Sequence, residues 1–178
     1  MRSIFSDRLI LRPWQQDDAH FLFDLESRQE SVRYLGPYAH TMTDIEEAKE
    51  SIRRRQSLDH SIYGIWLITS QEGTPLGNML LKPVRLSQSI KGINLQAPIE
   101  IGWQLHPDAQ GCGYATEAAK AVLDDAANRG LRTVMAVVDP NNSPSIHVCE
   151  RLHMTSRGIT QDYYDEDSLL FDKELGTH

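Results

Sequence analysis

The chain has 178 residues, of which 40% are hydrophobic and 24% are charged, and its formal net charge is −7. This length suits one domain with its own core, and the composition is ordinary for a globular protein. No apolar run is long enough to cross a bilayer and the first residues lack the apolar segment of a signal peptide, so we expect a cytoplasmic protein without a membrane partner.

The acidic balance argues against nucleic acid as a partner and suits a cationic substrate, although the same charge can simply keep a protein soluble. Two cysteines, Cys112 and Cys149, are too few for a disulfide framework and fit a reducing compartment. The histidines His106, His147 and His153 lack the spacing of metal ligands, and we interpret them as surface or loop residues. We therefore expect no metal.

The first elements in chain order are one strand and two helices. Residues 8–13 alternate in polarity and predict a strand, after which Asp17 is placed to cap a helix. A capping-box pattern begins at Thr43 and predicts a second helix to about Arg55.

The middle of the chain predicts three strands, over residues 63–69, 76–83 and 99–105. Residues 71–75 carry turn chemistry between the first two strands, and residues 85–97 form a polar loop before the third.

The clearest periodic element is a helix over residues 115–128. Its apolar side chains follow a helical rhythm at Ala115, Ala118, Ala119, Val122, Leu123, Ala126 and Ala127. Gly130 stands where a C-terminal cap belongs. The small alanines predict close packing of this helix on a sheet.

The chain then predicts a strand, a helix and two further strands. The strands are expected over residues 131–138, 154–160 and 168–175. The helix begins with Asn142 or Ser143 as its cap and Pro144 in its first turn. The resulting order, β-α-α-β-β-β-α-β-α-β-β, predicts an α/β fold (α+β in some schemes) in a single domain over residues 1–178.

Residues 110–115 read Gln-Gly-Cys-Gly-Tyr-Ala and join a hydrophobic strand to the alanine-rich helix. Glycines let the backbone come close to a ligand, and the N–H groups and dipole of a helix start favour anionic oxygens, so we expect a phosphate-bearing ligand. The turn lacks the Gly-Lys-Ser/Thr of a P-loop and the third glycine and distant acid of a dinucleotide fingerprint.

With Gln110, Gly113 and Ala115 in the defining places, this turn resembles Gln/Arg-x-x-Gly-x-Gly/Ala, the acetyl-CoA pyrophosphate loop of the GNAT N-acetyltransferases. Further segments are similar to the ribosomal-protein N-terminal acetyltransferase branch (RimJ/RimL-like). They are residues 8–14, 34–36, 63–66, 100–103 and 139–145.

The resemblance implies a GNAT-like fold, with a mixed, mostly antiparallel, splayed sheet flanked by helices. The pantetheine arm of acetyl-CoA would lie between the strand at 99–105 and the strand at 131–138. The residues implied to bind acetyl-CoA are Trp103 and Leu105 through their backbone, Gln110, Gly111, Cys112, Gly113, Tyr114, Ala115 and Thr116 in the loop, and Asn142.

The reaction implied is attack of an amine on the thioester in a ternary complex. Glu100 is the candidate general base, although it can also be a structural carboxylate near a strand end. Many relatives protonate the leaving thiolate with a tyrosine, whose place Cys149 takes here, so Ser145 is the candidate donor. Asn142 and Ser145 can alternatively act only as helix-capping residues.

The acceptor stays open between a protein N-terminal α-amine and a small amine. Four aromatic residues either line the acceptor pocket or belong to the core: Trp14, Tyr34, Tyr63 and Trp66. Cys112 stands where the family often has a basic residue. Together with Cys149, it motivates the alternative of a non-catalytic acyl-CoA-binding module. The oligomeric state, monomer or homodimer, is not fixed.

Overall fold

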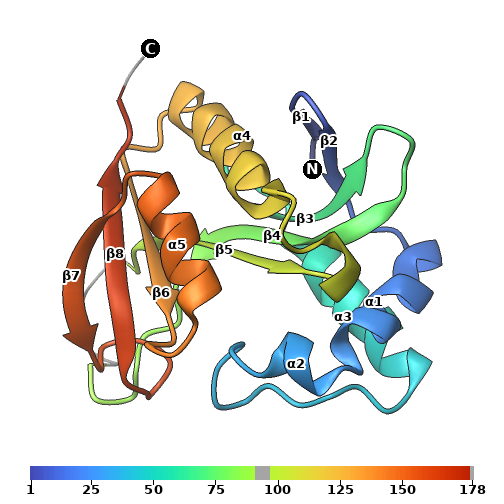
Figure 1. Ribbon diagram of the computed structural model, residues 1–178, viewed down its shortest axis with the longest axis horizontal. Helices are drawn as coiled ribbons and strands as arrows, with labels where there is room; N and C mark the ends of the chain where they lie inside the picture. The colour runs from blue at the N-terminus through green and yellow to red at the C-terminus, as the bar shows by residue number, and fades with distance from the viewer. Residues whose placement is uncertain (91–96, 177–178) are drawn as a thin grey trace.

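Eight strands form one sheet in the order β1-β2-β3-β4-β5-β6-β8-β7 (Figure 1). The computed structural model describes residues 1–90 and 97–176. The strands are β1 (Ile4–Phe5), β2 (Leu9–Pro13), β3 (Gly64–Ser70), β4 (Pro75–Pro83), β5 (Ile99–Leu105), β6 (Thr133–Val138), β7 (Thr155–Thr160) and β8 (Ser168–Glu174). Neighbouring strands are antiparallel except β5 and β6, which run parallel. The expected mixed, mostly antiparallel sheet is confirmed.

The helices are α1 (Ala19–Glu26), α2 (Gln29–Val32), α3 (Ile45–Ser57), α4 (Tyr114–Asn128) and α5 (Ser143–Arg151), with short 3₁₀ turns at Gln16–Asp18 and Pro107–Ala109. The predicted order of the longer elements is found. The sequence pattern missed β1 and α2, because two and four residues are too few to show a period. No helix in the described ranges is long and apolar enough to cross a bilayer. The polar loop predicted over residues 85–97 lies partly outside these ranges.

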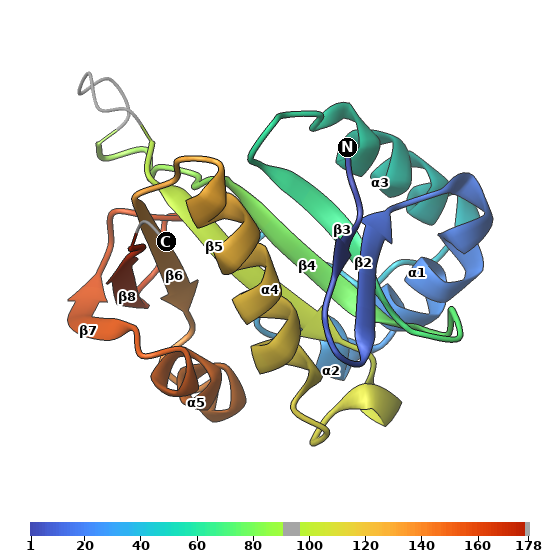
Figure 2. The same ribbon diagram turned by 90° about the horizontal axis from the view of Figure 1, so that it is seen from above.

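Two cores lie on the two faces of the sheet, and successive residues of β3 contribute to each in turn. Trp66 and Ile68 pack in the core beneath α4, whereas Leu67 packs against α1 and α3. This alternation follows from the two-residue period of a strand. All seven apolar residues predicted for the α4 stripe are buried. Seen from above, α4 crosses one face of β4 and β5 while α1 and α3 lie toward the other (Figure 2).

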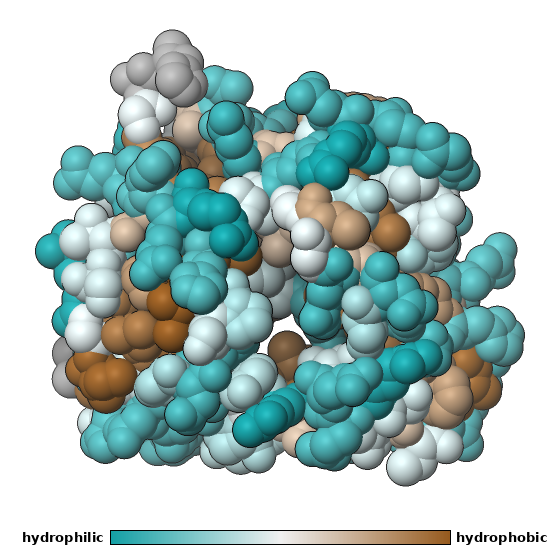
Figure 3. Space-filling view, viewed as in Figure 1, coloured by the Kyte–Doolittle hydropathy of each residue, from teal (hydrophilic) through white to brown (hydrophobic). Residues whose placement is uncertain are grey.

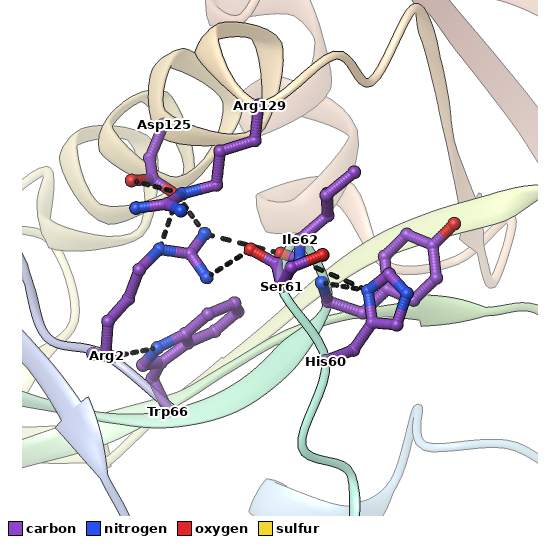
Figure 4. Close-up of polar contacts among 8 residues, drawn as sticks. Arg2, His60, Ser61, Ile62, Trp66, Asp125 and Arg129 are labelled. Atoms are coloured by element: carbon purple, nitrogen blue, oxygen red, sulfur yellow. Dashed lines mark hydrogen bonds and ion pairs between the residues drawn. The ribbon is translucent and has the colours of Figure 1, made fainter.

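The N-terminal segment fixes α4 over the sheet through Arg2 (Figure 4). The Arg2 guanidinium pairs with Asp125 on α4, with Nε 2.9 Å from the carboxylate, and donates to the Ser61 carbonyl at 2.9 Å. The indole N–H of Trp66 donates to the Arg2 carbonyl at 2.9 Å. These bonds join α4, the segment before β3 and the chain start, so the helix that follows the glycine turn has a fixed place.

Two helix starts lie beside the residues predicted as caps. A 3₁₀ turn precedes α1, and Asp18 rather than Asp17 stands at the N-cap position of α1. Its side chain makes no capping bond to α1 and instead accepts the Gln15 N–H of the 3₁₀ turn at 2.7 Å. Helix α3 is capped by Asp44, whose carboxylate accepts the Glu46 N–H at 2.8 Å. At α3 two adjacent side chains, Thr43 and Asp44, are suitable caps, and Asp44 makes the capping bond.

Two helix ends show the same C-terminal motif. After α4, the Leu131 N–H donates to the Ala126 carbonyl at 3.0 Å and Gly130 takes a φ of +96°, which confirms the predicted cap. After α5, the Met154 N–H donates to the Cys149 carbonyl at 3.0 Å, and His153 adopts the left-handed conformation with a φ of +56°.

Candidate functional site

A cleft of about 990 Å³ opens where β5 and β6 separate. Within the described residues these strands are paired only at Glu100 and Met135. The cleft is lined by most of the residues predicted from the sequence: Glu100, Trp103, Leu105, Gln110, Gly111, Gly113, Tyr114, Ala115, Thr116, Asn142 and Ser145. The space-filling view shows the surface hollowed near its centre (Figure 3). The glycine turn and the candidate catalytic side chains therefore share one cavity.

The backbone of β5 presents hydrogen-bonding groups to this cleft. The His106 N–H donates to the Leu76 carbonyl at 2.9 Å, so His106 faces the β4 side of the ladder. Because a residue's N–H and C=O point to the same side and successive residues alternate, those of Trp103 and Leu105 point away from β4. They face the gap between β5 and the diverging β6. A ligand in this gap can form hydrogen bonds with them, as a neighbouring strand would.

The turn before α4 is shaped by two glycines in the left-handed region. Gly111 has a φ of +77° and Gly113, the N-cap of α4, a φ of +80°. A side chain at Gly111 would meet no atom within 4 Å, so the backbone there lies open to solvent. The first N–H groups of α4 lack intrahelical acceptors, and together with the helix dipole they form an anion site.

Arg8, the residue before β2, contacts this turn. Its Nη1 donates to the Cys112 carbonyl at 3.1 Å, its Nε donates to Glu117 at 2.7 Å, and its guanidinium lies 4.8 Å from the centre of the Tyr114 ring. The Cys112 side chain is exposed and does not line the cleft. Arg8 therefore holds the loop through the Cys112 carbonyl, while its own charge is paired with Glu117.

Replacing Arg8 with alanine is expected to weaken CoA binding by about tenfold, because the loop loses a charge-assisted bond that holds its carbonyl and its amides in place. Calorimetric titration with CoA measures this effect. Arg157→Ala, which removes an exposed pair with Asp172 on the distant β7 and β8, is the matched control. Equal affinities for the two variants would show that Arg8 does not order the loop.

Asn142 and Ser145 lie together at the start of α5, on the opposite wall of the cleft. The Asn142 side chain accepts the backbone N–H of Ser145 at 3.3 Å, and both residues are half-buried. Asn142 is therefore the helix cap that the sequence predicted. The backbone of Ser145, rather than its hydroxyl, completes that cap, so the hydroxyl is not needed to start the helix.

Glu100 is 7% exposed, and its Oε1 accepts a hydrogen bond from the Tyr164 hydroxyl at 2.5 Å. Burial raises the pKa of the Glu100 carboxyl above its ordinary value, against the opposing effects of Lys82, whose Nζ lies 3.7 Å away, and of Tyr164. A carboxylate with a raised pKa in a cleft is suited to take up a proton near neutral pH.

Lys82 and Tyr164 also line the cleft, and sequence analysis did not single them out. Lys82 faces Glu100 directly across the β4–β5 ladder, so pairing the two predicted strands in register would have found it. Tyr164 comes from the loop between β7 and β8, and no local pattern marks it. Its contact with Glu100 spans 64 residues of sequence.

Other singled-out residues lie in the core or hold structure. Cys149 is fully buried in α5, and burial raises the pKa of its thiol to about 12, so it stays protonated at neutral pH. Trp14 and Trp66 are core residues, whereas Tyr34 lines the cleft. His106, expected at the surface, is buried beside Asp24, with its Nε2 2.9 Å from the carboxylate.

No group of three or more His, Cys, Asp or Glu side chains able to hold a metal ion occurs in the part of the chain that the structure describes. Comparison with known families matches residues 8–155 to the acetyltransferase (GNAT) domain. The chain belongs to this family. The protein is therefore an acetyltransferase that uses acetyl-CoA.

Individual relatives agree with this family. This GNAT protein is 25% identical to an uncharacterized N-acetyltransferase, p20, of Bacillus licheniformis, over 97% of this chain and 93% of that one. An acetyltransferase from Agrobacterium tumefaciens is 25% identical, with a TM-score of 0.77 over 97% and 94% of the two chains. RimL, a ribosomal L7/L12 α-N-protein acetyltransferase solved with coenzyme A, gives a TM-score of 0.80 at 21% identity, over 99% and 100%.

Proposed function

We propose that the protein transfers the acetyl group of acetyl-CoA to a primary amine by direct attack in a ternary complex. The observation that carries this proposal is that one cleft contains both a glycine turn open to an anion and a buried carboxylate, Glu100. Acyl transfer needs both in one place, because the donor must be held while the acceptor loses a proton.

The donor is proposed to bind along β5 and the loop. The pantetheine arm pairs with the outward backbone groups of Trp103 and Leu105, with Asn142 on the facing wall. The pyrophosphate accepts hydrogen bonds from the N–H groups of residues 111–116, and Gln110 bounds the loop. Each charge-assisted bond of this kind contributes roughly 1.5–3 kcal/mol. Arg151, whose Nε donates to Thr116 at 3.1 Å, adds a positive charge beside the helix start.

Glu100 is proposed as the general base for the acceptor. An alkyl amine with a pKa near ~10.4 is almost fully protonated at neutral pH, and an α-amine near ~7.7–8.0 partly so. The nitrogen must lose this proton before it can attack the thioester carbon. A buried carboxylate with a raised pKa in the same cleft can accept it, directly or through water.

Ser145 is proposed to donate to the sulfur as the thiolate leaves. Replacing Ser145 with alanine is expected to lower turnover by about tenfold or more while CoA affinity stays nearly constant, because the donor acts in the transition state. Steady-state kinetics and CoA titration on one preparation measure both quantities.

Ser143→Ala is the matched control for Ser145→Ala, since Ser143 is an exposed residue of the same first turn. Equal losses of turnover and affinity in Ser145→Ala would assign the residue to binding or helix structure instead.

A protein N-terminal α-amine is the acceptor that we favour over a small amine. The support is the similarity of the whole fold to the RimL α-N-protein acetyltransferase. We place the reaction in the cytoplasm, within a single N-acetyltransferase domain over residues 1–178 and without a required metal.

The test is thiol release from acetyl-CoA with a panel of N-terminal peptides and small amines. Stimulation by peptides above small amines is expected. Tight CoA binding without acceptor-stimulated release across the panel would contradict catalysis and favour a non-catalytic acyl-CoA-binding module.

A further inference from the structure

The loop between β7 and β8 carries a tyrosine into the cleft. The Tyr164 hydroxyl donates to Oε1 of Glu100 at 2.5 Å, and Lys82 Nζ lies 3.4 Å from the same hydroxyl. Burial and the nearby charge of Glu100 raise the pKa of Tyr164 above its ordinary value. The phenol therefore keeps its proton over the whole physiological range and remains a hydrogen-bond donor to the carboxylate.

Tyr164 reaches Glu100 through an unusual backbone conformation. Tyr164 and Asp165 both have a φ of +60°, a region that residues other than glycine seldom occupy. Such a conformation persists only where the surroundings impose it, and it often marks a functional site.

The surroundings that impose it are the residues that follow β4. The Tyr164 N–H donates to the Arg85 carbonyl at 3.2 Å, and the Asp165 N–H donates to the Ser87 hydroxyl at 2.9 Å. The Asp165 carboxylate in turn accepts the Gln88 N–H at 2.6 Å. The loop is thus anchored to residues 85–88, which belong to the same β4–β5 connection that leads into Glu100.

The two oxygens of Glu100 have different environments. Oε1 accepts the Tyr164 hydrogen bond and lies 3.7 Å from Lys82 Nζ. Oε2 is buried and has no hydrogen-bond partner among the described residues. A buried carboxylate oxygen without a partner is unfavourable, so the ionised form of Glu100 depends on the hydrogen bond and the charge at Oε1.

We propose that Tyr164 is a positioning residue, which holds the Glu100 carboxylate through Oε1 in the ionised form that takes up the proton of the acceptor nitrogen, directly or through water. This inference rests on the proposed function of Glu100 as base. The ammonium N–H bond breaks, its electron pair stays on nitrogen, and the proton forms an O–H bond on the Glu100 carboxylate. Glu100 becomes the neutral acid, while Tyr164 keeps its own proton throughout and Lys82 remains a cation beside both groups.

Replacing Tyr164 with phenylalanine keeps the ring and removes only the hydroxyl. The lost hydrogen bond had favoured the ionised carboxylate, so the pKa of Glu100 rises and the base becomes available only at higher pH. We expect the acidic limb of the kcat/KM profile to move up by roughly one pH unit, so that kcat/KM at a pH on this limb falls about tenfold. CoA affinity stays unchanged.

Tyr163→Phe removes the neighbouring hydroxyl in the same loop and serves as the matched control. Its acidic limb of the kcat/KM profile is expected to stay where it is in the wild type.

Tyr164→Phe in the Glu100→Gln background is expected to add no further loss of kcat/KM, because the hydroxyl acts through the carboxylate. A readout independent of turnover is the ¹³C-carboxyl titration of Glu100 in the free enzyme, assigned by the signal that Glu100→Gln lacks. Its midpoint rises in Tyr164→Phe.

The positioning role would be overturned if Tyr164→Phe left both the titration midpoint of Glu100 and the acidic limb of kcat/KM unchanged. If Glu100→Gln were still slow in that case, the proposed function would stand. A normal rate for Glu100→Gln across pH would instead refute the base itself, and the role of Tyr164 with it.

Discussion

Replacing Gly113 with glutamate is expected to abolish detectable CoA binding, a loss of more than about a hundredfold. The residue caps α4 with a φ of +80°, where the backbone N–H groups converge. A glutamate there adds backbone strain and places a carboxylate where the pyrophosphate should bind, so two anions compete for one set of donors. Calorimetric titration with CoA measures the change.

The chain offers a matched control for Gly113→Glu. Gly73, in the turn between β3 and β4, has a φ of +89° and open space around the position of a Cβ. Gly73→Glu therefore adds a similar strain and the same charge away from the cleft, and should bind CoA normally. If Gly113→Glu also kept its affinity, the pyrophosphate would not lie on this loop.

Replacing Glu100 with glutamine is expected to lower kcat/KM by roughly 10²–10⁴-fold at neutral pH, the usual contribution of a general base. The effect should be largest above the pKa of Glu100 and below that of the acceptor amine, where the wild type has an ionised base and the amine still holds its proton. Toward alkaline pH the free amine needs no base, so the mutant approaches the wild type. Rates measured across pH test this.

Loss of folding does not explain such a result. Burial raises the pKa of Glu100 in the folded state. Its ionisation therefore opposes folding once the pH exceeds the pKa of Glu100 in the unfolded chain. Glutamine carries no charge, and thermal unfolding at neutral pH should show a stability equal to or above that of the wild type. Glu50→Gln, an exposed change on α3, controls for loss of a carboxylate. A constant ratio of mutant to wild-type rate across pH would exclude the base role.

The elements with a strong sequence period were predictable, and the reason is burial. The alanine stripe of α4 and the apolar run of β5 each face a core, so their periods follow the geometry of helix and strand. Gly111 and Gly113 were informative for a different reason, because only glycine readily adopts the positive φ that the turn requires.

The parts of the site that sequence analysis missed depend on long-range contacts. Arg8 meets the glycine turn across 104 residues, and Tyr164 meets Glu100 across 64. Each is an ordinary residue in its local context, and its role appears only when the sheet brings its segment to the cleft. The shift of the α3 cap from Thr43 to Asp44 has a smaller cause, since two adjacent side chains could each accept the same kind of N–H.

The divergence of β5 and β6 has a consequence for the stability of the protein against unfolding. Among the described residues, β5 and β6 meet only at Glu100 and Met135, so most of their facing edges lack a neighbouring strand. A ligand that fills the gap binds the native chain and not the unfolded one, and at a hundred times its Kd it adds about 2.7 kcal/mol to stability. If acetyl-CoA binds along β5 as proposed, removing it should lower the free energy of unfolding of the protein.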